Sequence, residues 1–147
     1  MVNKKKNNFK ILLVEDNPAD VRLTKQAIQK SELVSQLDVV KDGVEAIHFL
    51  KKFKKDTHAV YPDLILLDLN LPKKNGLEVL KEIKEDEDLK RIPVVVLTIS
   101  SNEEDLLKAY NLHANSFIKK PLDIKEFYII VEFICTYWFK VVKLATT

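Results

Sequence analysis

Charged and hydroxyl side chains follow four short apolar runs of the sequence. Glu15 and Asp16 follow the first run, Asp68 the second, Thr98 the third, and Lys120 a weaker run further on. Three carboxylates close together repel one another, and a hard divalent cation that prefers oxygen ligands, such as Mg²⁺, relieves that repulsion. Asp68 is then a candidate nucleophile of the aspartyl-phosphate kind, and the ammonium and hydroxyl groups could hold phosphoryl oxygens.

Each of these residues alone has a more ordinary explanation. An acidic pair after a strand is commonly a solvated turn or a helix cap, and a single lysine there is commonly solvated. Their joint occurrence favours one shared site, because ligands of an open α/β sheet bind outside the carboxyl ends of its strands.

The elements that must position these residues alternate along the chain. Short apolar runs, typical of strands buried on both faces, lie at 11–14, 64–67 and 94–97. Weaker strands, expected nearer the sheet edges, lie at 37–40 and 116–118. Helix-start signals lie at 17–18, 42–45, 76, 101–104 and 123–126. Five strands alternating with five helices predict a doubly wound α/β fold with a parallel sheet.

Composition excludes several classes of protein. The 147 residues suit one domain, and 24 basic against 22 acidic residues leave a net charge of +2, which gives no argument for nucleic-acid binding. Only Gly43 and Gly76 occur, so a glycine-rich phosphate loop cannot be written. No apolar run is long enough to span a membrane and no secretory signal is present, and the single Cys135 suits a reducing compartment. We therefore expect a cytoplasmic protein.

Four motifs make the sequence resemble the receiver domain of two-component response regulators. They are VEDN at 14–17, DLNLPKKNG at 68–76, PVVVLT at 93–98 and KP at 120–121. The resemblance covers about residues 10–139 and implies a flavodoxin-like sheet of strand order 2-1-3-4-5. The segments 68–76 and 137–144 further resemble small response regulators encoded beside bacterial phytochrome-type histidine kinases.

The resemblance assigns the phosphorylation and metal roles. It makes Asp68 the phosphoacceptor and a ligand of Mg²⁺. Asp16 would bind the cation directly, Glu15 would assist through water, and the backbone carbonyl of Asn70 would be a further ligand.

The resemblance also assigns the switch. Thr98 would move onto the phosphoryl oxygens, Lys120 would contact the phosphoryl group, and Phe117 would be the switch aromatic residue, often tyrosine in the family. The Lys120–Pro121 peptide bond is expected to be cis.

The resemblance implies a signalling module. Residues 1–8 would be a basic, flexible tail and residues 9–145 the receiver with an extended final helix, without an output domain. A sensor histidine kinase would donate the phosphoryl group, and an unidentified downstream protein would receive the signal, with neither nucleic acid nor membrane as a partner. The only chemistry expected is self-phosphorylation from phosphodonors and self-dephosphorylation.

Three alternatives stay open. A haloacid-dehalogenase-like phosphohydrolase would need an acid two residues after its nucleophile, where Asn70 stands. A flavin-binding protein of the same fold would need a small, hydroxyl-rich first loop, but here that loop is acidic. A degenerate receiver, which binds partners without phosphorylation, is disfavoured by the complete set of site residues.

The final helix carries more apolar residues than one buried stripe needs. The expected stripe is Phe127, Ile130, Val131, Ile134, Trp138 and Val141. The surplus is Tyr128, Ile129, Phe133, Tyr137, Phe139 and Val142. We expect this surplus to form a homodimer contact. The alternatives are packing against the fourth helix of the same chain and binding to a membrane surface.

Overall fold

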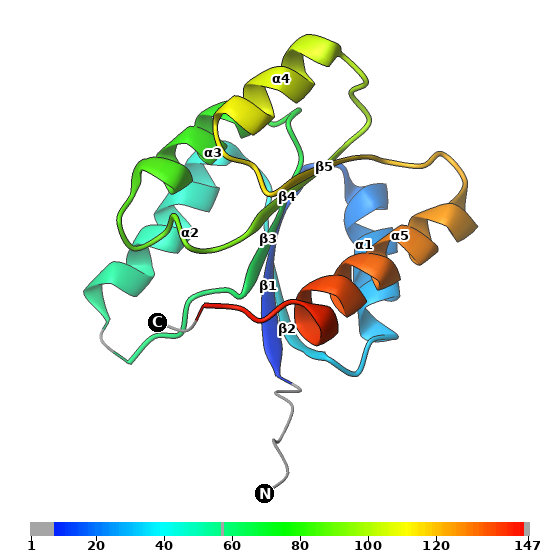
Figure 1. The fold of residues 1–147 in the computed structure, drawn as a ribbon, viewed down its shortest axis with the longest axis horizontal. Helices are drawn as coiled ribbons and strands as arrows, with labels where there is room; N and C mark the ends of the chain where they lie inside the picture. Colours follow the sequence, from blue (N-terminus) through cyan, green and yellow to red (C-terminus); the bar gives the residue numbers. More distant parts are fainter. Residues whose placement is uncertain (1–7, 57, 146–147) are drawn as a thin grey trace, which may run out of the picture.

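Strands and helices alternate through the whole described part of the chain (Figure 1). The computed structural model describes residues 8–56 and 58–145. The strands are β1 Phe9–Val14, β2 Val34–Val40, β3 Leu64–Leu67, β4 Val94–Thr98 and β5 Ser116–Lys119. The helices are α1 Pro18–Gln29, α2 Gly43–Lys55, α3 Gly76–Glu85, α4 Glu103–Asn111 and α5 Ile124–Thr136, followed by a π-helical turn, η1, at Tyr137–Val141.

The five strands form one parallel sheet of order β2-β1-β3-β4-β5, as the resemblance implied. The three continuously apolar runs occupy the centre, where β3 and β4 are buried along their whole length. The two weaker runs are the edge strands β2 and β5, so the sequence-based prediction is confirmed. The predicted α/β doubly wound fold is therefore the observed one.

Each face of the sheet packs against its own group of helices (Figure 1). On one face, alternate strand residues such as Leu12 and Ile65 pack against α2, α3 and α4. On the other face, Ile11 and Leu66 pack against α1, α5 and η1. Because successive side chains of a strand point to opposite faces, an unbroken apolar run fills both cores.

Side-chain caps begin the helices close to the predicted positions. Asn17, followed by Pro18, caps α1, and Asp42, Asn102 and Asp123 cap α2, α4 and α5. The capping box predicted at 101–104 is not the observed arrangement, because the α4 cap is Asn102. A capping box is formed instead at α3, between Asn75 and Glu78.

The end of the last helix corrects the predicted buried stripe. Val142 N–H donates to Tyr137 O at 2.8 Å, five residues back, which marks a π turn. Each residue of such a turn advances less around the helix axis than in an α-helix, so the buried face is shifted. Phe139, expected among the surplus, is only 7% exposed and stacks on Phe9, whereas Val141, expected in the stripe, is 68% exposed.

Among the described residues, no helix has both the length and the apolar character needed to cross a bilayer. The flexible tail predicted for residues 1–8 lies outside the described residues, apart from Asn8. The predicted receiver body of residues 9–145 is described except for residue 57.

Candidate functional site

The strand register brings Glu15 and Asp68 together at the carboxyl edge of the sheet. Val14 and Leu67 are partners in the β1–β3 ladder, so the residues that follow them are neighbours. Asp68 N–H donates to Val14 O at 3.0 Å, and Glu15 N–H donates to Val40 O at 3.0 Å. These bonds continue the ladders by one residue, so the backbone under both carboxylates is fixed by the sheet.

Three carboxylates form a group that fits a divalent cation. Oxygen atoms of Glu15, Asp16 and Asp68 all lie within 4.8 Å of one another, with Glu15 and Asp68 buried and Asp16 exposed. Oxygen ligands with one open side suit Mg²⁺, which keeps several waters. The N–H of Asn70 donates to Asp68 Oδ1 at 3.2 Å, which holds the following loop against Asp68. The role of the Asn70 carbonyl as a ligand stays a prediction.

Lys120 is the positive centre of the site. Its side chain is 4% exposed, and its ammonium donates to Glu15 Oε1, to Asp20 Oδ2 at 2.9 Å and to Asp68 Oδ2 at 3.3 Å. Burial alone would lower the pKa of Lys120, but the hydrogen bonds to Glu15 and Asp20 and the charge of Asp68 raise it above its ordinary value. The ammonium therefore stays protonated, and all three of its donors are used.

Glu15 is harder to ionise than an ordinary glutamate, because its pKa is raised. Burial raises its pKa to about 7, although its hydrogen bond to Lys120 acts in the opposite direction, and the charge of Asp68 raises it further. A second bond, from Asn17 N–H to Glu15 Oε2 at 3.2 Å, fixes the other carboxylate oxygen. A bound cation would favour the ionised form of Glu15 over the protonated one.

Sequence reasoning missed Asp20 as a site residue. In the sequence it looks like any acidic residue in the first turn of a capped helix, and its N–H does donate to the Asn17 cap at 3.2 Å. Its carboxylate, however, reaches the Lys120 ammonium. The signal that could have found it is its place one helical turn after the acidic loop, on the helix that β1 leads into.

The predicted switch residues lie on β4 and β5. Thr98 is fully buried at the end of β4, and its carbonyl accepts from Lys120 N–H at 2.7 Å. Phe117 is half-buried, and its N–H donates to the hydroxyl of Tyr110 on α4 at 3.2 Å. The expectation of a cis bond at Lys120–Pro121 was wrong, because the described residues contain no cis peptide bond. The trans form is the one that X–Pro bonds favour, by about 0.5–1 kcal/mol.

Both glycines of the sequence make room for the loop that follows Asp68. A Cβ at Gly76 would lie 2.4 Å from the Asp68 carbonyl oxygen, and one at Gly43 would lie 1.9 Å from the Lys74 carbonyl oxygen. Gly76 N–H also donates to Leu69 O at 3.0 Å, which closes the loop. The glycine that ends the motif 68–76 is thus needed because the backbone of Asp68 and Leu69 occupies the space that a Cβ would take.

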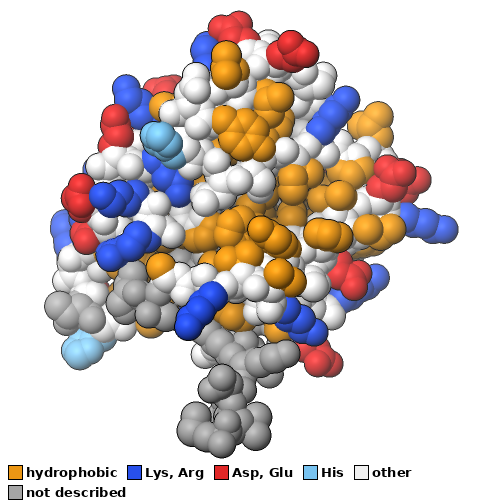
Figure 2. All heavy atoms as spheres, viewed as in Figure 1, with side chains coloured by type: hydrophobic (Ala, Val, Ile, Leu, Met, Phe, Trp, Pro, Cys, Tyr) orange, Lys and Arg blue, Asp and Glu red, His pale blue; other side chains and the backbone are white. Residues whose placement is uncertain are grey.

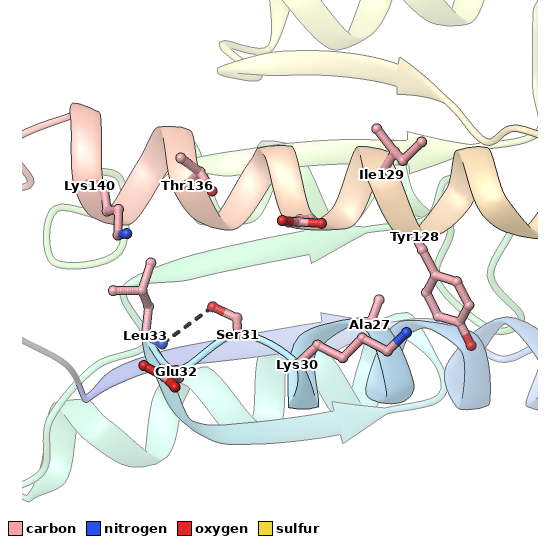
Figure 3. A pocket seen from close by; sticks show the side chains of 10 residues that line it. Ala27, Lys30, Ser31, Glu32, Leu33, Tyr128, Ile129, Thr136 and Lys140 are labelled. Carbon is pink, nitrogen blue, oxygen red and sulfur yellow. Dashed lines mark hydrogen bonds between the residues drawn. The ribbon is translucent and has the colours of Figure 1, made fainter.

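A separate hollow of about 690 Å³ lies between the end of α1 and α5 (Figure 3). Lys30, Glu32, Glu132 and Lys140 contribute charges of both signs to its lining. Lys30 Nζ lies 4.6 Å from the centre of the Tyr128 ring. None of the carboxylates of the metal group lines this hollow, so it is distinct from the site at the strand ends.

Comparisons with known proteins agree with this geometry. Residues 11–132 match the family model of the response regulator receiver domain. Response regulator Rcp1 of Synechocystis sp. is 46% identical over 134 residues, which cover 91% of each chain. The structure of the phosphorylated cyanobacterial phytochrome response regulator RcpA has a TM-score of 0.89 and 47% identity, and the match covers 95% of this chain and 99% of RcpA.

A second solved structure is that of the Mn²⁺-bound form of Rcp1. It has a TM-score of 0.86 and 45% identity, and the match covers 94% of this chain and 99% of Rcp1. The similarity to phytochrome response regulators confirms the narrower resemblance found in the sequence. The chain belongs to the response regulator receiver domain family.

Proposed function

We propose that this protein takes a phosphoryl group from a sensor histidine kinase onto Asp68 in a Mg²⁺-dependent step and passes the signal on by protein–protein contact. The observation that carries the proposal is the convergence of the buried Lys120 ammonium and the carboxylates of Glu15 and Asp16 on Asp68. The phosphorylated state of RcpA and the metal bound by Rcp1 support it.

Asp68 supplies the nucleophile. One of its carboxylate oxygens forms a bond to the phosphorus of a phosphohistidine, while the P–N bond breaks and its electron pair stays on the imidazole. The imidazole leaves neutral, because its other ring nitrogen carries a proton. Lys120, 3.3 Å from Asp68 Oδ2, places positive charge where the phosphoryl oxygens arrive. Mg²⁺ held by Asp16, Asp68 and the Asn70 carbonyl, with Glu15 assisting, would add positive charge to neutralise those oxygens.

The signal then leaves through β4, β5 and α4. The Thr98 hydroxyl moves onto the phosphoryl oxygens, and the half-buried Phe117 shifts with it. Because the Phe117 N–H is bonded to the Tyr110 hydroxyl, a shift of β5 reaches α4. Figure 2 shows hydrophobic side chains gathered over the face that α4 and α5 border, which suits a protein partner better than a nucleic acid.

The donor that fits best is a phytochrome-linked histidine kinase in the cytoplasm. RcpA is described as a phytochrome response regulator, and a bacteriophytochrome response regulator, RtBRR, matches 95% of this chain with a TM-score of 0.72 and 37% identity.

The protein further forms a homodimer through α5 and η1. Ile129, Phe133, Tyr137 and Val141 are exposed and follow one another at intervals of four residues, along a hollow of about 350 Å³. A two-fold axis between Phe133 and Tyr137 would set Ile129 of one copy against Val141 of the other, in an antiparallel helix pair. The stripe is therefore complementary to itself, as a two-fold contact requires.

Peptide mapping after incubation with Mg²⁺ and acetyl phosphate tests the central step. We expect one modified residue, Asp68, and no modification of Asp68→Asn. Transfer from a phosphorylated phytochrome-type kinase should show the same dependence on Asp68. Label on another residue, or full labelling of Asp68→Asn, would contradict the proposal.

A further inference from the structure

Asp20 differs from the other carboxylates that hold Lys120. Glu15 and Asp68 belong to the group of oxygens that fits a cation, whereas Asp20 is not part of that group. Its oxygen lies 2.9 Å from the Lys120 ammonium, and its side chain is 25% exposed. Lys120 therefore has two partners that a cation would share and one that it would not.

The backbone around Asp20 is held in place by the start of α1. The Asn17 side chain accepts from the N–H groups of Ala19 and Asp20, and Pro18 fixes the first turn. The Thr24 hydroxyl donates to Asp20 O at 2.7 Å. The carboxylate is thus aimed at Lys120 from a rigid element, so little ordering is needed to keep the pair together.

Loading the site changes what Lys120 can bind. A cation at Glu15, Asp16 and Asp68 draws charge from two carboxylates, Glu15 and Asp68, that now accept from the ammonium, and a phosphoryl group on Asp68 takes one of its oxygens covalently. A buried ammonium without a carboxylate partner is costly, and it would either leave the site or compete with the cation for Glu15 and Asp68.

We propose that Asp20 is a positioning residue that holds the Lys120 ammonium beside Asp68 while the cation occupies Glu15, Asp16 and Asp68. Cation and lysine then occupy the site together, and the ammonium stays aimed at the phosphoryl oxygens. This role rests on the proposed function and adds a residue that the metal-binding and phosphorylation motifs do not include.

A double-mutant cycle on metal affinity separates this role from a simple charge effect. Asp20→Asn should weaken Mg²⁺ binding, measured by calorimetry, by about tenfold, the lower end of the loss usual for residues that orient a metal site. In Lys120→Met the ammonium no longer competes, so the same substitution should change the affinity by less than about twofold. Equal losses in both backgrounds would mean that Asp20 acts only through its charge and would overturn the proposal.

Glu103→Gln is the matched control for charge. Glu103 is exposed in the first turn of α4, at the same edge of the sheet, and its substitution removes the same charge. It should leave Mg²⁺ affinity within about twofold of wild type. Asp20→Glu, which keeps a carboxylate on a longer side chain, should restore part of the affinity. If it binds as weakly as Asp20→Asn while both unfold like wild type, a carboxylate is not what the site needs, and the proposal fails.

The ammonium itself gives a readout that does not depend on activity. In wild type bound to Mg²⁺ and beryllofluoride, a mimic of the phosphoryl group, the ¹⁹F spectrum should contain a distinct signal for the fluorine beside Lys120. Asp20→Asn should shift or broaden that signal and leave the others in place. An unchanged spectrum would overturn the proposal, whereas failure of Asp68 to be labelled in wild type would overturn the proposed function instead.

Discussion

At the scale of single residues, the direction of a lysine's pKa shift depends on whether its ammonium faces carboxylates or only neutral acceptors. Lys120 is surrounded by carboxylates, and its pKa is raised. Lys84 donates to Lys90 O and Ile92 O at 3.0 Å and to Asn115 Oδ1 at 3.1 Å, all neutral acceptors. Burial lowers its pKa to about 8. The pKa values of the two lysines are therefore shifted in opposite directions.

Lys84 should make the protein more stable as pH rises. An unfolded lysine keeps its proton to about pH 10.4, so between about pH 8 and 10 the unfolded state binds more protons than the folded state. Under that condition the free energy of unfolding increases with pH. Urea unfolding across this range should show the wild-type value rising relative to that of Lys84→Met. Parallel pH profiles would show that Lys84 is not the responsible group.

Asp16 should contribute most of the metal affinity. It is the exposed member of the carboxylate group, so it can reach a hydrated cation directly, and Mg²⁺ relies on few protein carboxylates. Calorimetry should show that Asp16→Ala loses most of its Mg²⁺ affinity, whereas Glu103→Ala, which removes an exposed carboxylate elsewhere at the same edge, keeps it. Unchanged affinity in Asp16→Ala would point to a different set of ligands.

At the scale of elements, periodicity predicted which segments are helical but not where the last helix changes its turn. The strands were predictable because β1, β3 and β4 are buried on both faces and therefore apolar, apart from Lys10 in β1 and Thr98 at the end of β4. The carboxylate site was predictable because parallel strands end at one edge. The π turn was not, because nothing in the spacing of Trp138, Phe139 and Val141 distinguishes it from a continued α-helix.

The π turn predicts a large difference between two neighbouring substitutions. Phe139 is buried and its ring lies 4.2 Å from that of Phe9, so Phe139→Ala should cost about 3–5 kcal/mol of unfolding free energy. Val141 is largely exposed, so Val141→Ala should stay within about 0.5 kcal/mol. Denaturant unfolding measures both values. A larger loss for Val141→Ala than for Phe139→Ala would mean that Val141, and not Phe139, lies in the buried stripe.

At the scale of the whole molecule, the features that the sequence hid are those that join distant segments. Asp20 and Lys120 lie 100 residues apart, and Gly43 makes room for Lys74 across two elements. Neither pairing leaves a local pattern, since an acidic residue in a first helical turn and a glycine before a helix both have ordinary local explanations. Only the packed fold shows their second role.

The proposed homodimer should depend on the stripe of α5 and η1 and not on exposed apolar residues in general. Sedimentation at micromolar concentration should show a wild-type dimer and a folded monomer for Ile129→Glu with Phe133→Glu, because both side chains are exposed. Phe139→Glu, although Phe139 was first expected in the contact, would unfold the core. Leu107→Glu on α4, also exposed, should stay dimeric. If the wild type is monomeric, phosphorylated or not, the homodimer proposal is wrong, and the exposed stripe would then be a surface for a different protein.

The stacked rings of Phe9 and Phe139 also bear on how the protein is made. The ribosome delivers Phe9 at the start of β1 and Phe139 only 130 residues later (139 − 9), which takes on the order of ten seconds. Until then the core between the sheet and α1 lacks α5 and η1, which cover it, although β1 can already pair with β2 and β3. The nascent chain thus exposes this apolar face from the synthesis of β3 until that of α5 and η1, and transiently exposed apolar surface is the kind that chaperones protect.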